Sequence, residues 1–342
     1  MRRLRRLGIL IVLLAAAGSA VSFMWLSSEL ETPFYGSPES EVFVDVPRGA
    51  SARETANLLA RAGIIRHQLP FRVYLRYTDT GRRIQAGEYR FAEAASPRQI
   101  ARRLVQGDVF FYSITIPEGL TAHETVDLLA QKGLGNAAEM QRALSKTRWI
   151  RDLNPNARNL EGYLFPETYR FRRNTDSETI IRTMVDQFRS KLGKTLRDSP
   201  VPSGWNLSRI VILASMIEKE VRRPEEGPLV ASVMTNRLAK RMPLACDATI
   251  VYAMKIAGTY EGRLGKADLR MDSPYNSYVH FDLPPGPICN PGLAALRSAL
   301  NPANTGYYYY VSRNDGSHQF SKDYNSHVRA VNLYQKPLAR KP

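Results

Sequence analysis

Hydrophobic positions in residues 207–221 recur with a helical period, and one carboxylate falls among them. At about 100° per residue, one stripe contains Leu207, Ile210, Val211, Ala214, Ile217 and Val221. Glu218 lies inside this stripe, whereas Glu220 points to nearly the opposite side. Asn206 is placed to cap the start, and the cations and proline at 222–224 are typical of a helix end. The pattern predicts a buried helix with Glu218 on its apolar face.

Desolvation raises the pKa of a carboxyl group in such surroundings and favours its protonated form near neutral pH. A general acid needs this property, and glycoside-cleaving enzymes use glutamates placed against apolar surface. The alternative is a structural ion pair with an arginine such as Arg237 or Arg222, because buried glutamates are usually paired. The pattern alone leaves both interpretations of Glu218 open. For Glu220 we expect an arginine partner.

The N-terminal pattern is of a different kind. Four arginines among residues 1–6 precede Leu7–Ser28, a stretch of 22 residues without a charge, long enough to cross about 30 Å of hydrocarbon. It predicts a single transmembrane helix with the N-terminus in the cytoplasm and the remaining chain exported. A cleaved signal peptide is the alternative, because residues 18–20 resemble a cleavage site. Residues 29–41, with Pro33, Gly36, Ser37 and Pro38, are expected to be a linker that holds the exported part off the membrane surface.

An internal repeat follows the linker. Residues 44–64 align with residues 114–134, and in both copies a short strand turns at Pro-x-Gly into a helix that opens with a capping box. Each copy continues into a second strand and a further helix. We therefore predict two related α+β units, at 42–110 and 112–192. A small unit of this kind on an exported chain resembles the LysM wall-binding module, and the first copy fits that resemblance better; structural support is the alternative role.

A third region, 200–342, contains the helix that carries Glu218. It continues with a helix at 229–240, loops rich in proline and glycine between 273 and 292, a helix at 293–300 and a β-hairpin near 306–320. Segment 246–252 reads as a short helix or strand. The predicted fold class is α+β: an N-terminal transmembrane helix, a LysM-like repeated α+β unit, and then a mixed α+β catalytic domain.

Composition narrows the possible partners. The chain has 342 residues, 44% of them hydrophobic, and a net charge of +16, which implies an anionic neighbour such as membrane headgroups or cell-wall polymer. The basic residues are scattered and show no nucleic-acid-binding module, so we expect no nucleic acid partner. Histidines and cysteines lack metal-site spacing, and we expect neither a metal nor a cofactor. Cys246 and Cys289 could bridge in an exported domain or remain free thiols.

Five motifs together resemble the MltG/YceG-like endolytic murein transglycosylases, over nearly the whole chain. They are Leu160-Glu-Gly-Tyr-Leu-Phe-Pro-Glu-Thr-Tyr169, Leu213-Ala-Ser-Met-Ile-Glu-Lys-Glu220, Ser273-Pro-Tyr-Asn-Ser-Tyr278, Leu283-Pro-Pro-Gly-Pro-Ile-Cys-Asn-Pro-Gly292 and Asp315-Gly-Ser-His-Gln-Phe320. One departure is Cys246-Asp247-Ala248, where the family would have Ser-Asp-Pro, and this affects the expected shape of that loop.

The resemblance implies an enzyme of the cell inner membrane, with its body in the periplasm, that cuts nascent peptidoglycan strands internally. Glu218 matches the family's catalytic glutamate. It would protonate the oxygen between N-acetylmuramic acid and N-acetylglucosamine, and then take the proton of the muramic C6 hydroxyl as that group closes a 1,6-anhydro ring. Peptidoglycan synthases are expected as partners only through the resemblance.

Seven further residues are candidates for substrate binding: Glu161, Asp247, Ser273, Tyr275, Asn276, Tyr278 and Asn290. Loop capping is the structural alternative for those on the loops. A carboxylate about 5 to 9 Å from Glu218 would permit hydrolysis instead, and Asp247, Glu161 and Glu167 are the candidates. A non-catalytic wall-binding scaffold also remains open. A pyridoxal-phosphate lyase fits poorly, because no lysine has a recognisable Schiff-base context.

Overall fold

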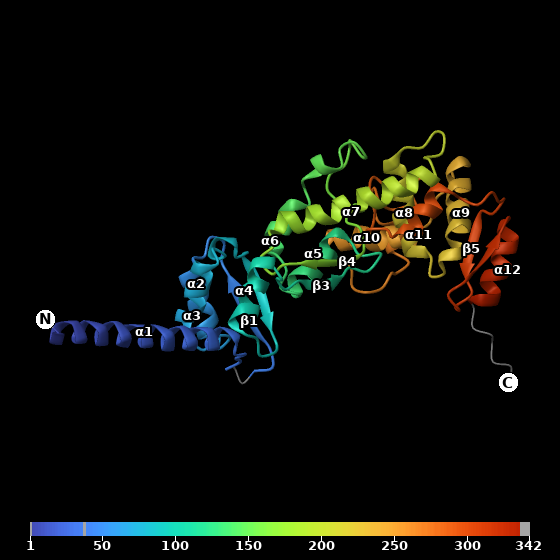
Figure 1. Cartoon of the computed structure of the whole chain (residues 1–342). Helices are drawn as coiled ribbons and strands as arrows, with labels where there is room; N and C mark the ends of the chain where they lie inside the picture. The colour runs from blue at the N-terminus through green and yellow to red at the C-terminus, as the bar shows by residue number, and fades with distance from the viewer. Residues whose placement is uncertain (1, 37–38, 336–342) are drawn as a thin grey trace, which may run out of the picture. The chain divides into compact units, whose positions relative to one another are not determined.

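The computed structural model describes residues 2–36 and 39–335 in two compact units, each described separately below (Figure 1). The first unit comprises residues 1–112 with 172–174, and the second comprises 113–171 with 175–342. Residues 1, 37–38 and 336–342 lie outside the described part. The expected N-terminal segment, the expected linker 29–41 and the end of the expected catalytic domain are therefore described only in part.

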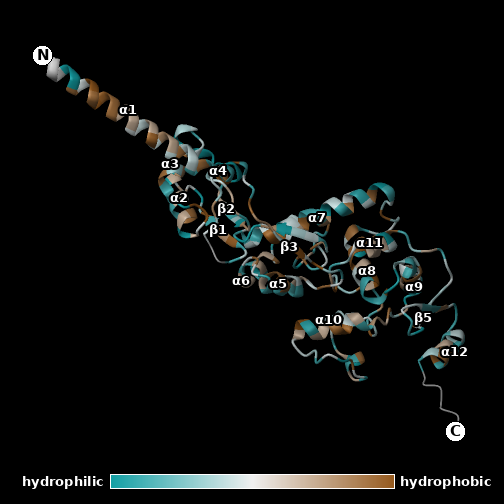
Figure 2. Ribbon diagram, turned by 60° about the horizontal axis from the view of Figure 1, so that its bottom comes forward, coloured by the Kyte–Doolittle hydropathy of each residue, from teal (hydrophilic) through white to brown (hydrophobic). Residues whose placement is uncertain are grey.

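Helix α1 (Arg2–Glu31) contains the apolar stretch near the N-terminus. Its residues 5–31 are long and apolar enough to cross a membrane, and hydrophobic colour covers most of the helix in Figure 2. The predicted N-terminal apolar helix is confirmed in this sense. It continues three residues beyond the expected end at Ser28, because Leu30 is buried against the first unit and Glu31 pairs with Arg98 at 2.9 Å.

The segment after α1 differs from the expected spacer. Phe34 forms an isolated antiparallel bridge with Ala95, and the Gly36 amide donates to the Gly63 carbonyl at 2.8 Å. These backbone bonds attach the described part of the linker to the first unit. The first unit is consequently held against the end of α1.

The first unit pairs strand β1 (Val42–Val46) with β2 (Gly87–Phe91) in an antiparallel ladder that aligns Val42 with Phe91. Helices α2 (Ala52–Arg61), α3 (Gln68–Tyr77) and α4 (Pro97–Gln106) and the short 3₁₀ helix η1 (Gly81–Arg83) complete it. The capping box that was predicted at Ser51 and Glu54 is confirmed. Aromatic and aliphatic side chains from both strands and all three helices form one hydrophobic core.

The second copy of the repeat follows the same order of elements. Strands β3 (Tyr112–Thr115) and β4 (Thr168–Phe171) pair, and helices α5 (Ala122–Gln131), α6 (Ala137–Ala143) and α7 (Ser177–Asp198) accompany them. A 3₁₀ helix, η2 (Thr147–Trp149), lies in the insertion between α6 and β4. The capping box predicted at Thr121 and Glu124 is confirmed. Two copies of one β-α-α-β-α unit support the repeat, whereas LysM-like glycan binding stays a prediction.

The second unit continues as a helical core with a terminal hairpin. Helix α8 (Leu207–Glu220) packs against α9 (Gly227–Ala239), α10 (Asp247–Ala257) and α11 (Leu293–Leu300). Strands β5 (Tyr309–Ser312) and β6 (His318–Ser321) form the hairpin, and α12 (Tyr324–Tyr334) packs on it. Short 3₁₀ helices are η3 (Pro224–Glu226) and η4 (Asp268–Arg270).

Two details go beyond the expected elements. The ambiguous segment 246–252 is helical, and α12 was not expected at all. The expected boundary between 112–192 and 200–342 lies inside the second compact unit. Packing of the second copy with the helices around α8 brings its loops near the end of α8.

Candidate carboxylate site

Glu218 occupies the last turn of α8, as the hydrophobic pattern predicted. Asn206 caps the start of this helix by accepting from the Arg209 amide at 2.9 Å, and residues 210–217 are all buried. Glu218 itself is partly exposed, so a substrate can reach it. Burial raises the pKa of its carboxyl group, which a hydrogen bond from the Gly292 amide opposes and the charge of Glu118 reinforces. On balance the pKa of Glu218 is raised, as a general acid requires.

A backbone donor holds this carboxylate in place. The Gly292 N–H donates to Glu218 Oε2 at 2.9 Å. No arginine or lysine forms an ion pair with Glu218 in the described ranges 2–36 and 39–335, although the neighbouring Lys219 lowers the pKa slightly through its charge. The Lys219 Nζ instead donates to the Gly119 carbonyl at 3.2 Å. The structural ion pair that the sequence left open is therefore not formed with Arg222 or Arg237.

Glu118 is a second carboxylate at this site and was not among the predicted site residues. It is an exposed residue in the Pro117–Leu120 turn, which lies beside the 283–292 loop. The Gly119 amide donates to the Asn290 carbonyl at 3.1 Å, and the Asn290 amide donates to the Leu120 carbonyl at 2.8 Å. Because Gly119 has a φ of +78°, the turn takes a left-handed conformation that favours glycine.

Close approach to Gly292 fixes how near the two carboxylates lie. A Cβ built on Gly292 would stand 1.8 Å from Glu118 Oε1, so the Glu118 carboxylate rests directly against the glycine backbone. Since the amide of the same glycine binds Glu218, standard backbone geometry limits the separation of the bound oxygen atoms to about 7 Å. This limit is compatible with the spacing of about 5 to 5.5 Å between the two carboxyl groups of retaining glycosidases.

The signal for Glu118 was present in the repeat. Its Pro-x-Gly turn aligns with residues 47–49, where Arg48 takes the central position. Arg48 and Glu118 thus carry opposite charges at the same turn position of two related copies. The fold that the copies share does not require this change of charge. Its proximity to Glu218 still depends on loops that are far apart in the chain.

Glu161 is buried, with 3% of its surface exposed, and lies at the N-terminus of α5. Its Oε1 accepts from the Ala122 amide at 2.9 Å, and the Tyr252 hydroxyl donates to its Oε2 at 3.3 Å. Burial raises the pKa of Glu161 to about 8, against the lowering effect of these bonds. In this structure Glu161 joins two helices and presents no exposed carboxylate.

The two candidate asparagines are buried and fully used by backbone partners. Asn290 accepts from the Gly162 and Leu164 amides, both at 3.0 Å, and donates to the Leu120 carbonyl at 3.0 Å. Asn276 donates to the Met271 carbonyl at 2.8 Å and accepts from the Tyr278 amide at 2.9 Å. Both therefore hold loops in place, and Asn290 joins the turn that carries Glu118 to the 160–164 segment.

The remaining candidates lie on the loop 273–278 and on α10. Buried Ser273 accepts from the Tyr275 amide at 3.3 Å, and the Tyr275 ring packs against Tyr252. The Tyr278 hydroxyl donates to the Asp247 carboxylate, which fixes α10 against this loop. Contact of these groups with substrate stays a prediction. Glu167, named as a possible second carboxylate, forms an ion pair with Lys191 at 2.7 Å.

Among the described residues, no arginine pairs with Glu220, contrary to the expectation. Its carboxylate accepts from the Cys246 thiol and the Tyr310 hydroxyl, both at 3.0 Å, and burial raises its pKa. Helical periodicity placed Glu220 on the correct side of α8, but the residues that pack there come from distant segments. Cys246 and Cys289 are both buried and free, so the disulfide that the sequence left open is not formed.

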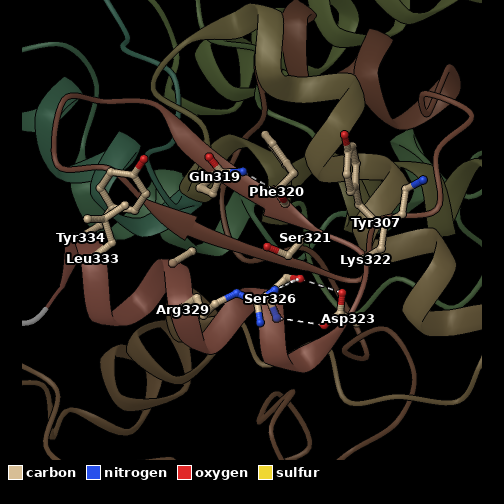
Figure 3. A pocket seen from close by; sticks show the side chains of 11 residues that line it. Tyr307, Gln319, Phe320, Ser321, Lys322, Asp323, Ser326, Arg329, Leu333 and Tyr334 are labelled. Carbon is tan, nitrogen blue, oxygen red and sulfur yellow. Dashed lines mark hydrogen bonds between the residues drawn. The ribbon is translucent and has the colours of Figure 1, made fainter.

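A pocket in the second unit lies between the β5–β6 hairpin and α12 (Figure 3). Its wall combines aromatic and charged side chains, including Tyr307, Phe320, Lys322 and Arg329. None of the predicted site residues lines it. Among the described residues, no group of three or more histidine, cysteine, aspartate or glutamate side chains could hold a metal ion; the expected absence of metal and cofactor stays a prediction.

Comparison with known proteins decides the family. The sequence profile of the YceG-like family matches residues 44–333. The chain belongs to the YceG-like family. An endolytic murein transglycosylase from Bacillus subtilis is 30% identical over 329 residues, which cover 92% of this chain and 90% of that protein. One from Streptococcus pneumoniae is 27% identical over 93% of this chain and 62% of its own length. This member of the YceG-like family thus matches about three fifths of the pneumococcal protein.

A solved structure in the same family has a similar fold. The crystal structure of a yceG-like protein from Listeria monocytogenes matches with a TM-score of 0.57 and 28% sequence identity. The match covers 85% of this chain and 98% of the Listeria chain. It supports the mixed α+β fold, and the resemblance that the five motifs indicated is confirmed.

Proposed function

We propose that this chain is a membrane-anchored endolytic lytic transglycosylase of peptidoglycan, with Glu218 as its catalytic acid and base. The observation that carries the proposal is the position of Glu218: a partly exposed carboxyl group at the end of a buried helix, with a raised pKa and no ion-pair partner in the described part of the chain. The family and the names of the Bacillus and Streptococcus relatives support the substrate class.

In the proposed mechanism, protonated Glu218 donates to the glycosidic oxygen that leaves C1 of N-acetylmuramic acid. The Gly292 N–H stabilises the carboxylate that results, through the bond to Oε2. This carboxylate then accepts the proton of the C6 hydroxyl while the C6 oxygen attacks C1 and closes the 1,6-anhydro ring. The proton count balances, because the proton given to the leaving oxygen is replaced by the one from C6.

Glu118 supplies the second charge at this site. A negative group near Glu218 favours the protonated acid before the reaction, and the same group stabilises positive charge that develops at C1 in the transition state. Glu118 has no role in proton transfer when the C6 hydroxyl is the nucleophile. Asn290 positions this carboxylate indirectly, by fixing the turn at 117–120.

A muramidase-type hydrolase is the second candidate, because Glu118 places a second carboxylate near Glu218. Carboxyl groups about 5 to 5.5 Å apart can form a glycosyl-enzyme intermediate, and groups about 6.5 to 9.5 Å apart can hold a water molecule between them. Glu118 would then act on water, or as nucleophile. The relatives' names favour the lytic reaction over this one.

Product analysis tests the proposal and separates it from the alternatives. Purified peptidoglycan digested with the full chain should yield fragments that end in 1,6-anhydro-muramic acid, detected by mass spectrometry. Reducing ends in their place would support the hydrolase. Intact strands, with binding retained, would support the scaffold. Cleavage within strands, and not only at their ends, is expected for the endolytic mode.

For the location, we propose that α1 spans the cell inner membrane once, with the enzyme body in the periplasm. A reporter active only in the cytoplasm, fused after the C-terminus, should be silent, and an active reporter would contradict this orientation. Peptidoglycan synthases as partners stay an expectation from the family resemblance.

A further inference from the structure

The first unit carries an exposed helical face of unusual composition. On α3, Leu69, Val73 and Tyr77 are 54%, 39% and 89% exposed, and they follow one another at intervals of four residues. Arg72 and Arg76 are exposed on the same side. Apolar side chains alternating with arginines on one exposed helix face are typical of helices that lie at a membrane surface.

An arginine-lined groove adjoins this face. The groove has a volume of about 990 Å³, and its charged lining includes Arg53, Arg72, Arg76 and Arg82 beside the apolar Leu69 and Val73. Asp79 is the acidic residue in the lining. In the described part of the chain, none of the four arginines forms a salt bridge, whereas Arg90, Arg98 and Arg103 of the same unit do.

Contacts with α1 place this face at the level where a membrane would end. The Trp25 ring lies 6.0 Å from the ring of His67, the residue that precedes α3. Tryptophan is enriched at the boundary between hydrocarbon and headgroups, and Trp25 lies near the end of the apolar stretch of α1. Figures 1 and 2 both show α3 beside the C-terminal part of α1, and the two helices are in contact.

Several contacts hold the unit against the end of α1. Leu30 is buried, Glu31 pairs with Arg98 of α4, and the residues after α1 bond to the same unit through Phe34 and Gly36. If α1 crosses a bilayer, α3 is therefore held at its surface. The sequence from 42 to 110 contains twelve arginines and six acidic residues, so this unit is positively charged as a whole.

We propose that the exposed face of α3 and its arginine-lined groove dock on the anionic headgroups of the bilayer that contains α1. Leu69, Val73 and Tyr77 enter the boundary region, and Arg72 and Arg76 bind lipid phosphates while their aliphatic stems lie along the apolar surface. The docked unit would hold the enzyme at the membrane surface, where nascent glycan strands emerge. This inference rests on the membrane anchoring in the proposed function and is independent of the chemistry at Glu218.

Spin labelling of the full chain in lipid nanodiscs tests the proposal. The two native cysteines are buried, so a nitroxide can be attached selectively at Val73→Cys. The measurement is the ratio of two collision rates of the nitroxide: that with oxygen, which concentrates in lipid, and that with a water-soluble nickel complex. Discs of phosphatidylcholine are compared with discs that also contain phosphatidylglycerol. Gln106→Cys, exposed at the far end of α4, is the control in water, and Leu13→Cys in α1 is the control in lipid.

We expect the oxygen-to-nickel ratio at Val73 to exceed that at Gln106 several-fold in anionic discs. The ratio should fall several-fold when Arg72→Gln and Arg76→Gln are combined, or when 0.5 M salt screens the charges. Combined Arg61→Gln and Arg102→Gln, the same charge change outside the groove, should leave it unchanged. Cleavage of soluble glycan fragments by all these variants should match that of the parent chain.

A label at Val73 as accessible to nickel as the one at Gln106, while Leu13 reports lipid, would overturn the docking proposal and leave the anchor intact. A label that becomes protected only after peptidoglycan fragments are added would overturn it in favour of glycan binding by this unit. Exposure of Leu13 to water would instead reject the anchor itself. Glycan cleavage, measured separately, reports on the proposed reaction.

Discussion

Glu118 and Glu218 meet at Gly292: the amide of this glycine binds the Glu218 carboxylate, and the space above its Cα is filled by the Glu118 carboxylate. Three segments that are distant in sequence thereby place two carboxylates within about 7 Å of each other. Burial raises the pKa of Glu218, and the charge of Glu118 raises it further. Each carboxylate can be tested separately.

Glu218→Gln should abolish cleavage while the fold is retained. A glutamine can still accept the Gly292 hydrogen bond, but it has no proton to donate, so we expect activity to fall by about 10²- to 10⁴-fold. Peptidoglycan digestion followed by mass spectrometry measures this, and thermal unfolding checks the fold. Glu220→Gln, on the same helix and bonded to Cys246 and Tyr310, is the matched control and should retain most activity. Full activity of the Glu218 variant would reject the assignment.

Glu118→Gln should impair the reaction less and alter its pH dependence. Loss of the negative charge lowers the pKa of Glu218, so the acid deprotonates earlier and the alkaline limb of kcat/KM moves to lower pH. The weaker stabilisation of charge at C1 should lower the rate by about 10-fold. Anhydro products are expected from the variant as from the parent. If Glu118 were the nucleophile or base of a hydrolase, the variant would lose cleavage altogether and the parent would release reducing ends.

Gly292→Ala tests the meeting point of the two carboxylates. Gly292 has a φ of −79°, which alanine adopts readily, but the new methyl group would collide with Glu118. Because Glu118 is an exposed, flexible side chain, it should move aside at a cost of no more than about 1 to 2 kcal/mol. Activity should then fall, and the alkaline limb should shift, as in Glu118→Gln.

Combining the two changes makes the test sharper. In a variant with both Gly292→Ala and Glu118→Gln, the loss should be close to that of Glu118→Gln alone, because the methyl group acts by displacing a charge that is already absent. Gly193→Ala, at an open position with no atom near the added methyl group, should leave activity unchanged. Fully additive losses would show that Gly292 acts independently of Glu118.

Much of the fold could be predicted because its signals are local. The capping boxes at Ser51 and Thr121, the cap at Asn206 and the apolar stripe of α8 all depend on residues within a few positions of one another. The same periodicity placed Glu218 on the apolar side of the helix. A family resemblance then supplied its role, which the periodicity left open.

What could not be predicted depends on contacts between distant segments. The charge of Glu118 acts on Glu218 because a turn near residue 118 pairs with a loop near residue 290. Glu220 faces a thiol and a phenol in place of the expected arginine, and the linker after α1 is bonded to the first unit. Side-chain periodicity predicts which side of a helix a residue occupies. It does not predict which residue from a distant segment packs against that side. The candidate asparagines show the same limit, because their amides are used by backbone groups.

Glu161 allows a prediction about stability and pH. Its pKa is about 8 in the folded chain and 4.5 as an isolated side chain, so the folded state holds this proton over that interval and the unfolded state does not. The contribution of protonated Glu161 is fully present below about pH 4.5 and is lost as the pH rises through about 8. We expect the melting temperature to fall by on the order of 5 °C between pH 6 and pH 9.

Glu161→Gln, which keeps the shape and the hydrogen bond from the Ala122 amide, should flatten this part of the curve of melting temperature against pH. Glu167→Gln is the control: Glu167 is paired with Lys191 and has a lowered pKa, so its replacement should leave the slope between pH 6 and pH 9 unchanged. An equally steep decline in Glu161→Gln would show that other groups cause the loss.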